Sequence, residues 1–368
     1  MDSAVDSPPA ETTGADSRRR SPLADLQAFI AALRITAQVA QTAGLSTATM
    51  SDLPMAAVFD PAIKPREGLS VDRDLTKRDE KIVSVLRERG ALRVMGAVAC
   101  PSLAQAISQL YESHANFSAA VDYVLGEEIL ARQQGEALSG LRLLLHGGAG
   151  EGKTDFSLSL ARLLDVPAEV ISLSSSQAAA YLAGSEQYWS NTQPGIVWRQ
   201  LIQGNHANPI FVLDETDKVS ANWGDPLGAL YQLLEPRSAS IFCDKSIPWL
   251  PIDASRCNWI ATANDPESLH PAIRSRFVEV EVSSPSEDAL RNLLQKLYSD
   301  LLAEFSLADR FPEMLSPEQA GVLLGGSIRD AKRLLRSAVA QALRDGRGAV
   351  TLMPPVPIGV SRQRIGFV

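Results

Sequence analysis

Short apolar runs alternate with helical patterns through the middle of the chain. Five of these runs predict strands, at residues 141–146, 168–173, 210–214, 258–262 and 277–282. An amphipathic pattern at residues 154–164 predicts a helix directly after the first run. Strands that alternate with helices indicate a parallel sheet with helices on both faces. We therefore predict an α/β fold built on a five-stranded parallel sheet.

Helical patterns without strand signals flank this region. They lie at residues 21–43, 79–98, 102–113 and 117–134 on one side and at 288–301 and 327–343 on the other. Residues 45–75 contain several prolines and little periodicity, which indicates a linker or an irregular segment. We divide the chain into a disordered tail (1–20), a mostly helical N-terminal region with a linker (21–104), an α/β domain (105–284), a small helical domain (285–350) and a C-terminal tail (351–368).

The composition is typical of a soluble globular protein. Of 368 residues, 45% are hydrophobic and 21% charged, and neither a run of 18 apolar residues nor a signal-peptide pattern occurs. The net charge of −8 argues against nucleic acid as a partner, although it leaves room for a local basic groove. The three cysteines and four histidines have no spacing typical of disulfides or metal sites. We therefore expect a cytoplasmic protein without a membrane partner.

A glycine-rich segment follows the first predicted strand. Residues 147–154, GGAGEGKT, fit the pattern G-x-x-x-x-G-K-[ST] of a phosphate-binding loop. Glycines let backbone N–H groups turn inward around an anion, and the helix that begins near Lys153 adds the positive end of its dipole. Lys153 can reach the β- and γ-phosphates, and the Thr154 hydroxyl is the usual Mg²⁺ ligand of such a loop. The predicted nucleotide-binding residues are Gly147, Gly148, Ala149, Gly150, Glu151, Gly152, Lys153 and Thr154.

Two carboxylates end another predicted strand, in the segment PIFVLDETDK at residues 209–218. Ligands of open α/β sheets bind at the carboxyl ends of the strands, so Asp214 and Glu215 would face the phosphate-binding loop. Asp214 can hold Mg²⁺ through its water shell, and Glu215 can orient and polarise an attacking water. This pair predicts hydrolysis of the bound nucleotide, with Thr154 and Asp214 at the metal.

Together with two later segments, these motifs resemble AAA+ ATPases, and specifically the ATPase module of the Lon protease family. The later segments are WIATAND at residues 259–265 and LHPAIRSRF at residues 269–277. Further likeness lies in AGSEQYWSNTQPG (183–195) and WGDPLGALYQLLEP (223–236), so the resemblance covers roughly residues 105–345. It implies ATP and Mg²⁺ as ligands, a lid formed by the C-terminal helical domain, and a homo-oligomeric ring with a hexamer as its expected size.

The resemblance also assigns roles to four polar residues. Asn264 resembles the sensor-1 residue, which helps to place the attacking water. Arg276 resembles the arginine finger, which stabilises charge on the nucleotide of a neighbouring subunit. Arg274 is a second candidate for that role or a supporting one. Arg329 resembles the sensor-2 arginine of the lid, so we expect catalytic roles for Glu215, Asn264, Arg276 and Arg329.

Two adjacent aromatic residues fall where the family has its pore loop. Trp189, with Tyr188 beside it, matches the pore-loop aromatic when counted from Gly184 to the Pro194–Gly195 pair. A large flat side chain suits contact with an extended polypeptide of any sequence. The segment departs from the family at Ser190, where an apolar residue is usual. The alternative interpretation is that both rings pack in the core.

The resemblance does not extend to proteolysis. Lon proteases continue after the lid into a domain with a serine–lysine dyad, and no segment of these 368 residues resembles that motif. We therefore expect a motor ATPase that remodels or unfolds polypeptide substrates or partner proteins, without protease activity of its own. One alternative is a nucleic-acid motor or loader, in which the basic tail at Arg362 and Arg364 could contact phosphates. Another is a nucleotide-dependent switch or adaptor, against which the intact Glu215 and Arg276 argue.

Overall fold

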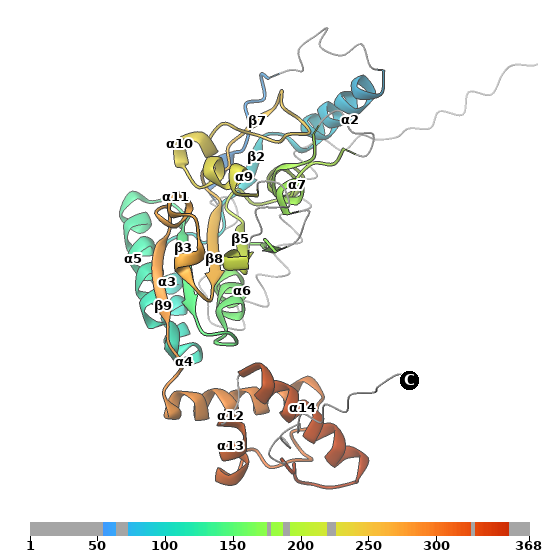
Figure 1. The fold of residues 1–368 in the computed structure, drawn as a ribbon. Helices are drawn as coiled ribbons and strands as arrows, with labels where there is room; N and C mark the ends of the chain where they lie inside the picture. The colour runs from blue at the N-terminus through green and yellow to red at the C-terminus, as the bar shows by residue number, and fades with distance from the viewer. Residues whose placement is uncertain are drawn as a thin grey trace, which may run out of the picture.

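The computed structural model describes residues 54–63, 73–174, 178–186, 192–218, 226–324 and 328–352. At its centre lies a parallel sheet of five strands in the order β4-β5-β8-β3-β9 (Figure 1). In chain order the strands are β3 (Arg142–Gly147), β4 (Ala168–Ser172), β5 (Ile210–Asp214), β8 (Asn258–Ala263) and β9 (Val278–Val282). These bounds differ from the predicted ones by about one residue at most, and the prediction of a five-stranded parallel sheet is confirmed.

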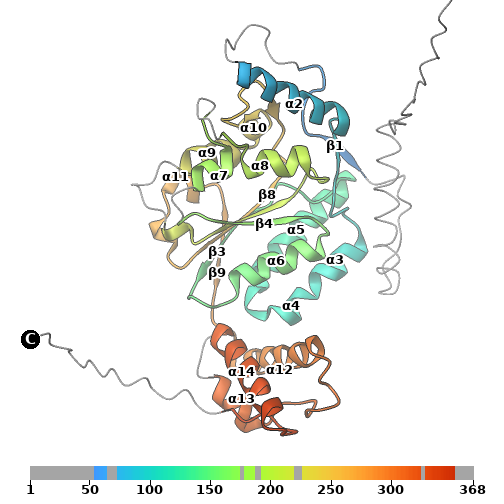
Figure 2. The same ribbon diagram turned by 90° about the vertical axis from the view of Figure 1, so that its right-hand side faces the viewer.

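Helices cover both faces of the sheet (Figure 2). On one face, Leu143 and Leu145 of β3 belong to a buried cluster with α5 (Ser118–Gln134) and α6 (Lys153–Leu163). On the other face, Leu144 belongs to a cluster with residues of α7 (Ala178–Ala183), α8 (Ile196–Trp198) and α9 (Pro226–Leu233). Successive strand residues point to opposite faces, so burial on both sides requires an uninterrupted apolar run. This is the physical reason why the strands could be recognised in the sequence.

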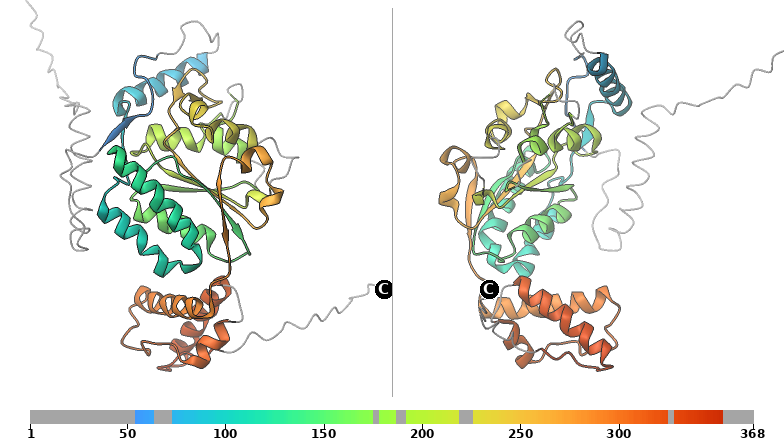
Figure 3. Two further views of the ribbon diagram at one scale, coloured as in Figure 1. Left: turned by 90° about the vertical axis from the view of Figure 1, so that its left-hand side faces the viewer. Right: turned by 45° about the vertical axis from the view of Figure 1, so that its right-hand side comes forward.

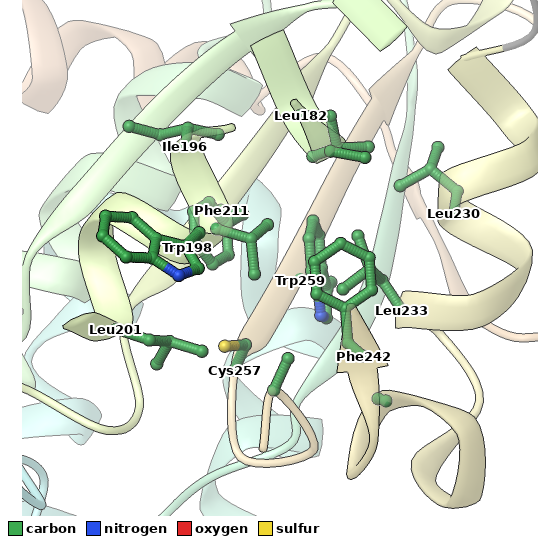
Figure 4. Packing of buried hydrophobic residues seen from close by; sticks show 14 of the residues in the cluster. Leu182, Ile196, Trp198, Leu201, Phe211, Leu230, Leu233, Phe242, Cys257 and Trp259 are labelled. Carbon is green, nitrogen blue, oxygen red and sulfur yellow. The ribbon is translucent and has the colours of Figure 1, made fainter. Parts of the chain in front are cut away.

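Large aromatic side chains fill the second of these faces (Figure 4). The ring of Trp259 in β8 stacks on that of Phe211 in β5, with 4.7 Å between their centroids. Trp198 of α8 and Phe242 of β6 are also fully buried in this cluster. Because buried aromatic rings contribute strongly to packing energy, the cluster fixes α8 and the β6–β7 hairpin on the sheet.

A small antiparallel ribbon precedes the sheet in the chain. Strand β1 (Met55–Ala57) pairs with β2 (Leu92–Val94), and α2 (Arg73–Arg89) lies between them in sequence. The prediction of one helix over residues 79–98 is therefore wrong beyond residue 89, because β2 follows there. The linker interpretation of residues 45–75 is likewise wrong at β1. Gly90, whose φ is +66°, ends α2 with a backbone conformation that glycine adopts without strain.

A buried arginine attaches this ribbon to the sheet domain. Arg93 of β2 is only 3% exposed, and its Nε and Nη2 donate to the carbonyls of Leu201 and Ile202 at 2.8 and 2.6 Å. Its Nη1 donates to the carbonyl of Leu92 at 2.7 Å. Burial lowers the pKa of Arg93 to about 10, but the side chain stays charged at neutral pH. The guanidinium therefore binds the free carbonyl groups at the end of a helical segment.

Short elements make up the remainder of the sheet domain and its surroundings. They are α3 (Pro101–Ser108), α4 (Leu110–Ser113), η2 (Ala115–Phe117), α7 (Ala178–Ala183), α8 (Ile196–Trp198), η3 (Arg199–Gln203), η4 (Thr216–Lys218), α9 (Pro226–Leu233), α10 (Pro236–Ala239), β6 (Phe242–Cys243), β7 (Pro251–Ile252), η5 (Pro266–Ser268) and α11 (Pro271–Arg274). None of the helices in the described part of the chain combines the length and apolar character needed to span a bilayer.

Three helices after the sheet form a separate C-terminal unit with its own buried cluster (Figure 3). They are α12 (Glu287–Glu304), α13 (Pro317–Leu324) and α14 (Ile328–Arg344). The first and last agree with the predicted helices, whereas α13 was not predicted. Helix α12 begins at Ser286, whose side chain accepts a hydrogen bond from the N–H of Ala289. The unit contributes side chains to the cavity described below.

Candidate functional site

The glycine-rich segment joins β3 to α6 with a backbone that only glycine tolerates at two positions. A Cβ atom added to Gly147 would lie 2.1 Å from the carbonyl oxygen of Val282 in β9. Gly152, the residue before α6, has a φ of +92°. The strand therefore ends against its neighbour, and the chain turns sharply into the helix, as a phosphate-binding loop requires.

Lys153 is folded back over this loop. It is 8% exposed, and its Nζ donates to the carbonyls of Gly147 and Gly148, both at 2.8 Å. The same Nζ lies 3.4 Å from Oδ1 of Asn264, at the end of β8. Burial lowers the pKa of Lys153, with the nearby carboxylates opposing that shift. The lysine charge is thus held at the centre of the loop and beside the predicted sensor residue.

The carboxylate at the end of β5 faces the start of α6. Oδ1 of Asp214 accepts hydrogen bonds from the Thr154 hydroxyl at 3.0 Å and from the Thr262 hydroxyl at 2.6 Å. One hydroxyl and one carboxylate suit Mg²⁺, which keeps several waters and takes its other ligands from substrate phosphates. The described residues contain no group of three or more acidic, histidine or cysteine side chains placed to hold a metal ion by themselves. Thr154 and Asp214 therefore fit a nucleotide-bound Mg²⁺.

Glu215 follows directly and has an unusual backbone. Its φ is +55°, uncommon for a residue other than glycine, and its N–H donates to the Thr262 hydroxyl at 3.2 Å. Its carboxylate lies 2.5 Å from Nζ of Lys218, in a pair of which both members are partly exposed. A backbone strained in this way is common at functional sites. Thr262, to which the sequence analysis assigned no role, contacts both acids.

Asn264 is positioned by a further acid that the motif analysis did not single out. The backbone N–H of Asn264 donates to Oδ2 of Asp217 at 3.1 Å. The other carboxylate oxygen of Asp217 is buried, and no hydrogen bond to it is found within the described residues. Asp217 and Lys218 belong to η4, the short turn that follows Glu215. The turn therefore brings the ends of β5 and β8 together.

These residues line a cavity of about 720 Å³ between the sheet domain and the C-terminal helical unit. Its walls come from the glycine-rich loop, the ends of β5 and β8, the segment at 113–117, α12 and α14. Arg329, the predicted sensor-2 residue, lines it together with Lys296 and Lys332. The volume is within the range of cavities that hold a drug-sized or nucleotide-sized ligand. Three exposed cations of the helical unit thus face the anion-binding loop.

Aromatic residues form another part of the wall, which the sequence analysis missed. Phe117 stacks on Phe156 with 4.5 Å between the ring centroids, and His114 meets Phe156 edge-on at 5.6 Å. The His114 ring lies 3.4 Å from the carboxylate of Asp155 and, as the largest cause, lowers the pKa of that acid. His114 and Phe117 line the cavity, whereas Phe156 is fully buried and supports them from behind. No local motif marks these residues in the sequence.

The two candidate finger arginines differ in their contacts. Arg274 makes a bidentate ion pair with Glu279, at 2.7 and 2.9 Å, and a second pair with Glu267 at 2.7 Å. Arg276 instead lies over the ring of Tyr231, 5.6 Å from its centroid. Neither arginine is among the described residues that line the cavity. The pore-loop candidates Tyr188 and Trp189 lie outside the described residues.

Comparison with known proteins identifies relatives of this part of the chain. Residues 143–284 match the model of the ATPase family associated with various cellular activities (AAA). The Lon protease of Amoebophilus asiaticus is 31% identical over 157 residues, which are 43% of this chain and 19% of that protein. The peroxisomal Lon protease homolog 2 of Caenorhabditis elegans is 33% identical over 178 residues, 48% of this chain and 23% of that protein. The chain thus spans about a fifth of the length of these relatives.

Solved structures with a similar fold include Hsp104 of Saccharomyces cerevisiae. Its casein complex in the extended conformation has a TM-score of 0.52 at 17% identity, covering 66% of this chain and 47% of that one. The closed state of Hsp104 with ATPγS and FITC casein has a TM-score of 0.56 at 15% identity, covering 75% of this chain and 53% of that one. At these identities the likeness concerns the fold alone.

Proposed function

The chain contains an AAA module similar to that of Lon proteases, and on this premise we propose that it is a Mg²⁺-dependent ATPase. One observation carries the proposal. The loop lysine Lys153, the metal-site pair Thr154 and Asp214, and the predicted sensor Asn264 converge at one sheet edge, with Glu215 adjacent. Each of these side chains has a part in phosphoryl transfer to water.

The proposed reaction is attack of water on the γ-phosphorus of ATP, with cleavage of the bond to the β-phosphate and release of ADP and phosphate. Bound Mg²⁺ would neutralise charge on the phosphate oxygens. Lys153 and the backbone N–H groups of the loop hold the phosphates, while Asn264 and Glu215 orient the water. Positioning and preorganised charge supply most of the rate gain in such reactions. We further propose that the surface at His114 and Phe117 receives the base.

The C-terminal helical unit is proposed to act as a lid over the nucleotide. Arg329, Lys296 and Lys332 reach the cavity from α12 and α14, so ATP would attract these three cations more strongly than ADP would. The angle of the unit would then follow the nucleotide state. Hydrolysis of ATP would in this way be coupled to a change in the angle of the helical unit.

We also propose a homo-oligomeric ring, with a hexamer as its expected size. Arg276 supports this, because it resembles an arginine finger and is not among the described residues lining the cavity of its own chain. In a ring it would complete the site of the neighbouring subunit. The proposed substrate is an unfolded polypeptide in the cytoplasm, contacted by Tyr188 and Trp189. The solved Hsp104 structures were obtained with casein, which supports this class of partner by analogy.

The proposal is tested with Glu215→Gln, which keeps the size of the side chain and removes its basicity. We expect this variant to retain ATP and the assembled state while turnover is abolished, as measured by phosphate release, nucleotide content and native mass. Glu304→Gln, on the outer surface of α12, is the matched control and should behave as wild type. Wild-type turnover by Glu215→Gln would refute the assignment.

A second measurement concerns the substrate class. Wild-type ATPase activity should rise with unfolded casein and not with DNA, and casein should not be cleaved. Stimulation by DNA alone would support a nucleic-acid motor or loader instead. An ATPase that responds to neither would support a nucleotide-dependent switch or adaptor.

A further inference from the structure

Asp244 is a buried acid outside the nucleotide cavity. It follows β6 directly and is 0% exposed. One carboxylate oxygen, Oδ2, accepts the N–H of Gly195 at 2.7 Å, and the other accepts the N–H and hydroxyl of Ser246 at 2.9 and 2.5 Å. A buried carboxylate needs such donors, because an unpaired one is very costly. Asp244 therefore joins its own hairpin to a segment about 50 residues earlier in the chain.

That earlier segment lies between α7 and α8 in the sequence, and hydrogen bonds join its two described ends, residues 184–186 and 192–195. The N–H of Ser185 donates to the carbonyl of Gln193 at 3.2 Å, and the N–H of Gln193 donates to the Ser185 hydroxyl at 3.0 Å. We call the paired residues 184–186 and 192–195 the neck of this segment. The aromatic residues assigned to polypeptide contact lie between the two halves of the neck in sequence.

Both terminal glycines of the neck are required, Gly184 by its contact with Asp244 and Gly195 by its contact with the end of α7. A Cβ atom added to Gly184, whose φ is +82°, would lie 2.1 Å from Oδ1 of Asp244. A Cβ atom added to Gly195 would lie 2.5 Å from the carbonyl oxygen of Leu182. The backbone of the neck is thus pressed against the carboxylate.

The hairpin that carries Asp244 makes further contacts with the neck. The N–H of Lys245 donates to the carbonyl of Ala183 at 2.9 Å, and Nζ of Lys245 lies 3.2 Å from the carboxylate of Glu186. The hairpin thus holds the neck by one buried and one exposed charged contact.

On its other side the same hairpin rests on the N-terminal elements. Ile252 of β7 forms a bridge with Phe59, just after β1, and Nε1 of Trp249 donates to Asp79 of α2 at 3.0 Å. Burial raises the pKa of Asp244, while its hydrogen bonds and the charge of Arg78, in the preceding position of α2, oppose that shift. The neck is therefore connected through the hairpin to a part of the chain whose role the motifs leave unassigned.

We propose that Asp244 is the positioning residue of the neck. By fixing the neck to the hairpin, it supports the polypeptide-dependent activity and links the neck to the N-terminal elements. The inference rests on the proposed function for the polypeptide-dependent part of its role. The structural part, that Asp244 holds the neck, stands on the geometry alone.

The test variant is Asp244→Asn, which keeps the shape but replaces one acceptor oxygen by an N–H donor. The chain offers a matched control in Asp253→Asn. Oδ1 of Asp253 accepts the N–H and hydroxyl of Ser255 at 3.0 and 2.5 Å, in the same local turn that Asp244 makes with Ser246. Its Oδ2, however, pairs with Arg256 and not with residues of the neck. Lys245→Ala loosens the exposed contact with little risk to folding.

The first measurement is hydrogen exchange of the full-length protein. We expect the amide of Gly195 to exchange roughly ten- to a hundredfold faster in Asp244→Asn, the effect of losing one charged hydrogen bond. In Asp253→Asn it should exchange as in wild type. Unchanged exchange in Asp244→Asn would overturn the proposal that this residue holds the neck.

The second measurement is ATPase activity with and without unfolded casein. Basal activity should be retained in all three variants, while casein stimulation should be lost in Asp244→Asn, reduced in Lys245→Ala and intact in Asp253→Asn. Full stimulation of Asp244→Asn would overturn the positioning role. If wild type itself is not stimulated, the proposed function and the polypeptide-dependent part fail, and hydrogen exchange still decides the structural part. Should Asp244→Asn not fold, Lys245→Ala is compared with Asp253→Asn: faster exchange at the neck and reduced stimulation in Lys245→Ala alone would support attachment of the neck to the hairpin, and no difference between the two would overturn it.

Discussion

The hydroxyl of Thr262 lies 2.6 Å from Oδ1 of Asp214, the oxygen that also accepts a hydrogen bond from Thr154. Thr262 belongs to β8, and Asp214 ends the adjacent strand β5. The hydroxyl therefore does not contact the proposed metal itself. It orients the carboxylate of Asp214 by a hydrogen bond. Interactions of this kind are commonly as important to a metal site as its direct ligands.

The first prediction concerns this contact. Thr262→Val keeps the shape of the side chain but removes the hydroxyl, so Asp214 loses a partner. We expect Mg²⁺ to bind the ATP complex roughly 10- to 100-fold more weakly, as measured by the Mg²⁺ dependence of phosphate release. Thr262→Ser, which restores the donor, should recover most of the affinity. Equal Mg²⁺ dependence in Thr262→Val and wild type would refute this role.

The second prediction concerns the ion pair of Glu215 and Lys218. The ammonium group lies 2.5 Å from the carboxylate that is proposed to orient water, and it competes with that water for the same oxygen. Lys218→Met should therefore raise basal turnover, by roughly two- to fivefold because exposed ion pairs are weak. The effect should appear in kcat and leave the KM for ATP unchanged. A fall in kcat would indicate instead that Lys218 assists the reaction.

The sequence predicted those parts of the fold that repeat a simple physical pattern. Strand β5 was predicted with its observed bounds because four buried apolar residues precede Asp214. The ribbon strand β2 was missed because Leu92 is exposed and only three residues pair, so the run continues the helical pattern of α2. Gly90, a typical residue at the end of a helix, was the available signal for the boundary.

In the candidate site, too, the sequence predicted only the residues that belong to a simple pattern. Asp214 and Asn264 meet because the carboxyl ends of parallel strands lie at one edge of the sheet. Thr262 lies within the segment WIATAND but received no role there, because it is a threonine inside an apolar strand, and His114 belongs to no motif and precedes the loop by more than 30 residues. Their roles depend on tertiary packing, which a single sequence does not reveal.

The third prediction separates the two candidate finger arginines. Arg276→Ala should abolish turnover in the assembled protein, since fingers are worth roughly 10³–10⁵ in rate. Arg274→Ala should keep most of the activity, because its guanidinium is already paired with Glu267 and Glu279. Phosphate release by each purified variant tests this difference. The reverse ranking would assign the finger to Arg274.

A mixing experiment tests whether Arg276 acts between subunits. Arg276→Ala retains an intact Glu215, and Glu215→Gln retains an intact arginine, so a mixed ring contains some complete sites. Turnover should therefore reappear when the two inactive variants are assembled together. Mixing Arg276→Ala with itself at the same total concentration is the control. No recovery in a proven mixed ring would show that the arginine acts within its own chain.

The last prediction concerns pH and the attachment of the N-terminal ribbon. His206 forms a bridge with Val94 of β2, and its ring is in van der Waals range of Gly96, where Val166 and the carbonyl of Asp165 leave no space for a side chain. Burial lowers the pKa of His206 below its usual 6.5, and the charge of Asp165 partly opposes this shift. In the unfolded chain the histidine therefore binds a proton at higher pH than it does in the folded protein.

This difference fixes the sign of the pH effect. The stability associated with neutral His206 is fully present above about pH 6.5 and is lost as the pH falls through the lower pKa of the folded state. The free energy of unfolding changes by at most about 1.4 kcal/mol per pH unit, and by less to the extent that solvent reaches the ring. Denaturant unfolding between pH 5 and 8 should thus show a shallower decline for His206→Gln than for wild type. Asp165→Asn, which removes the opposing charge and tolerates the φ of +52° at that position, should extend the decline to lower pH. Identical slopes in wild type and His206→Gln would place the acid sensitivity elsewhere in the molecule.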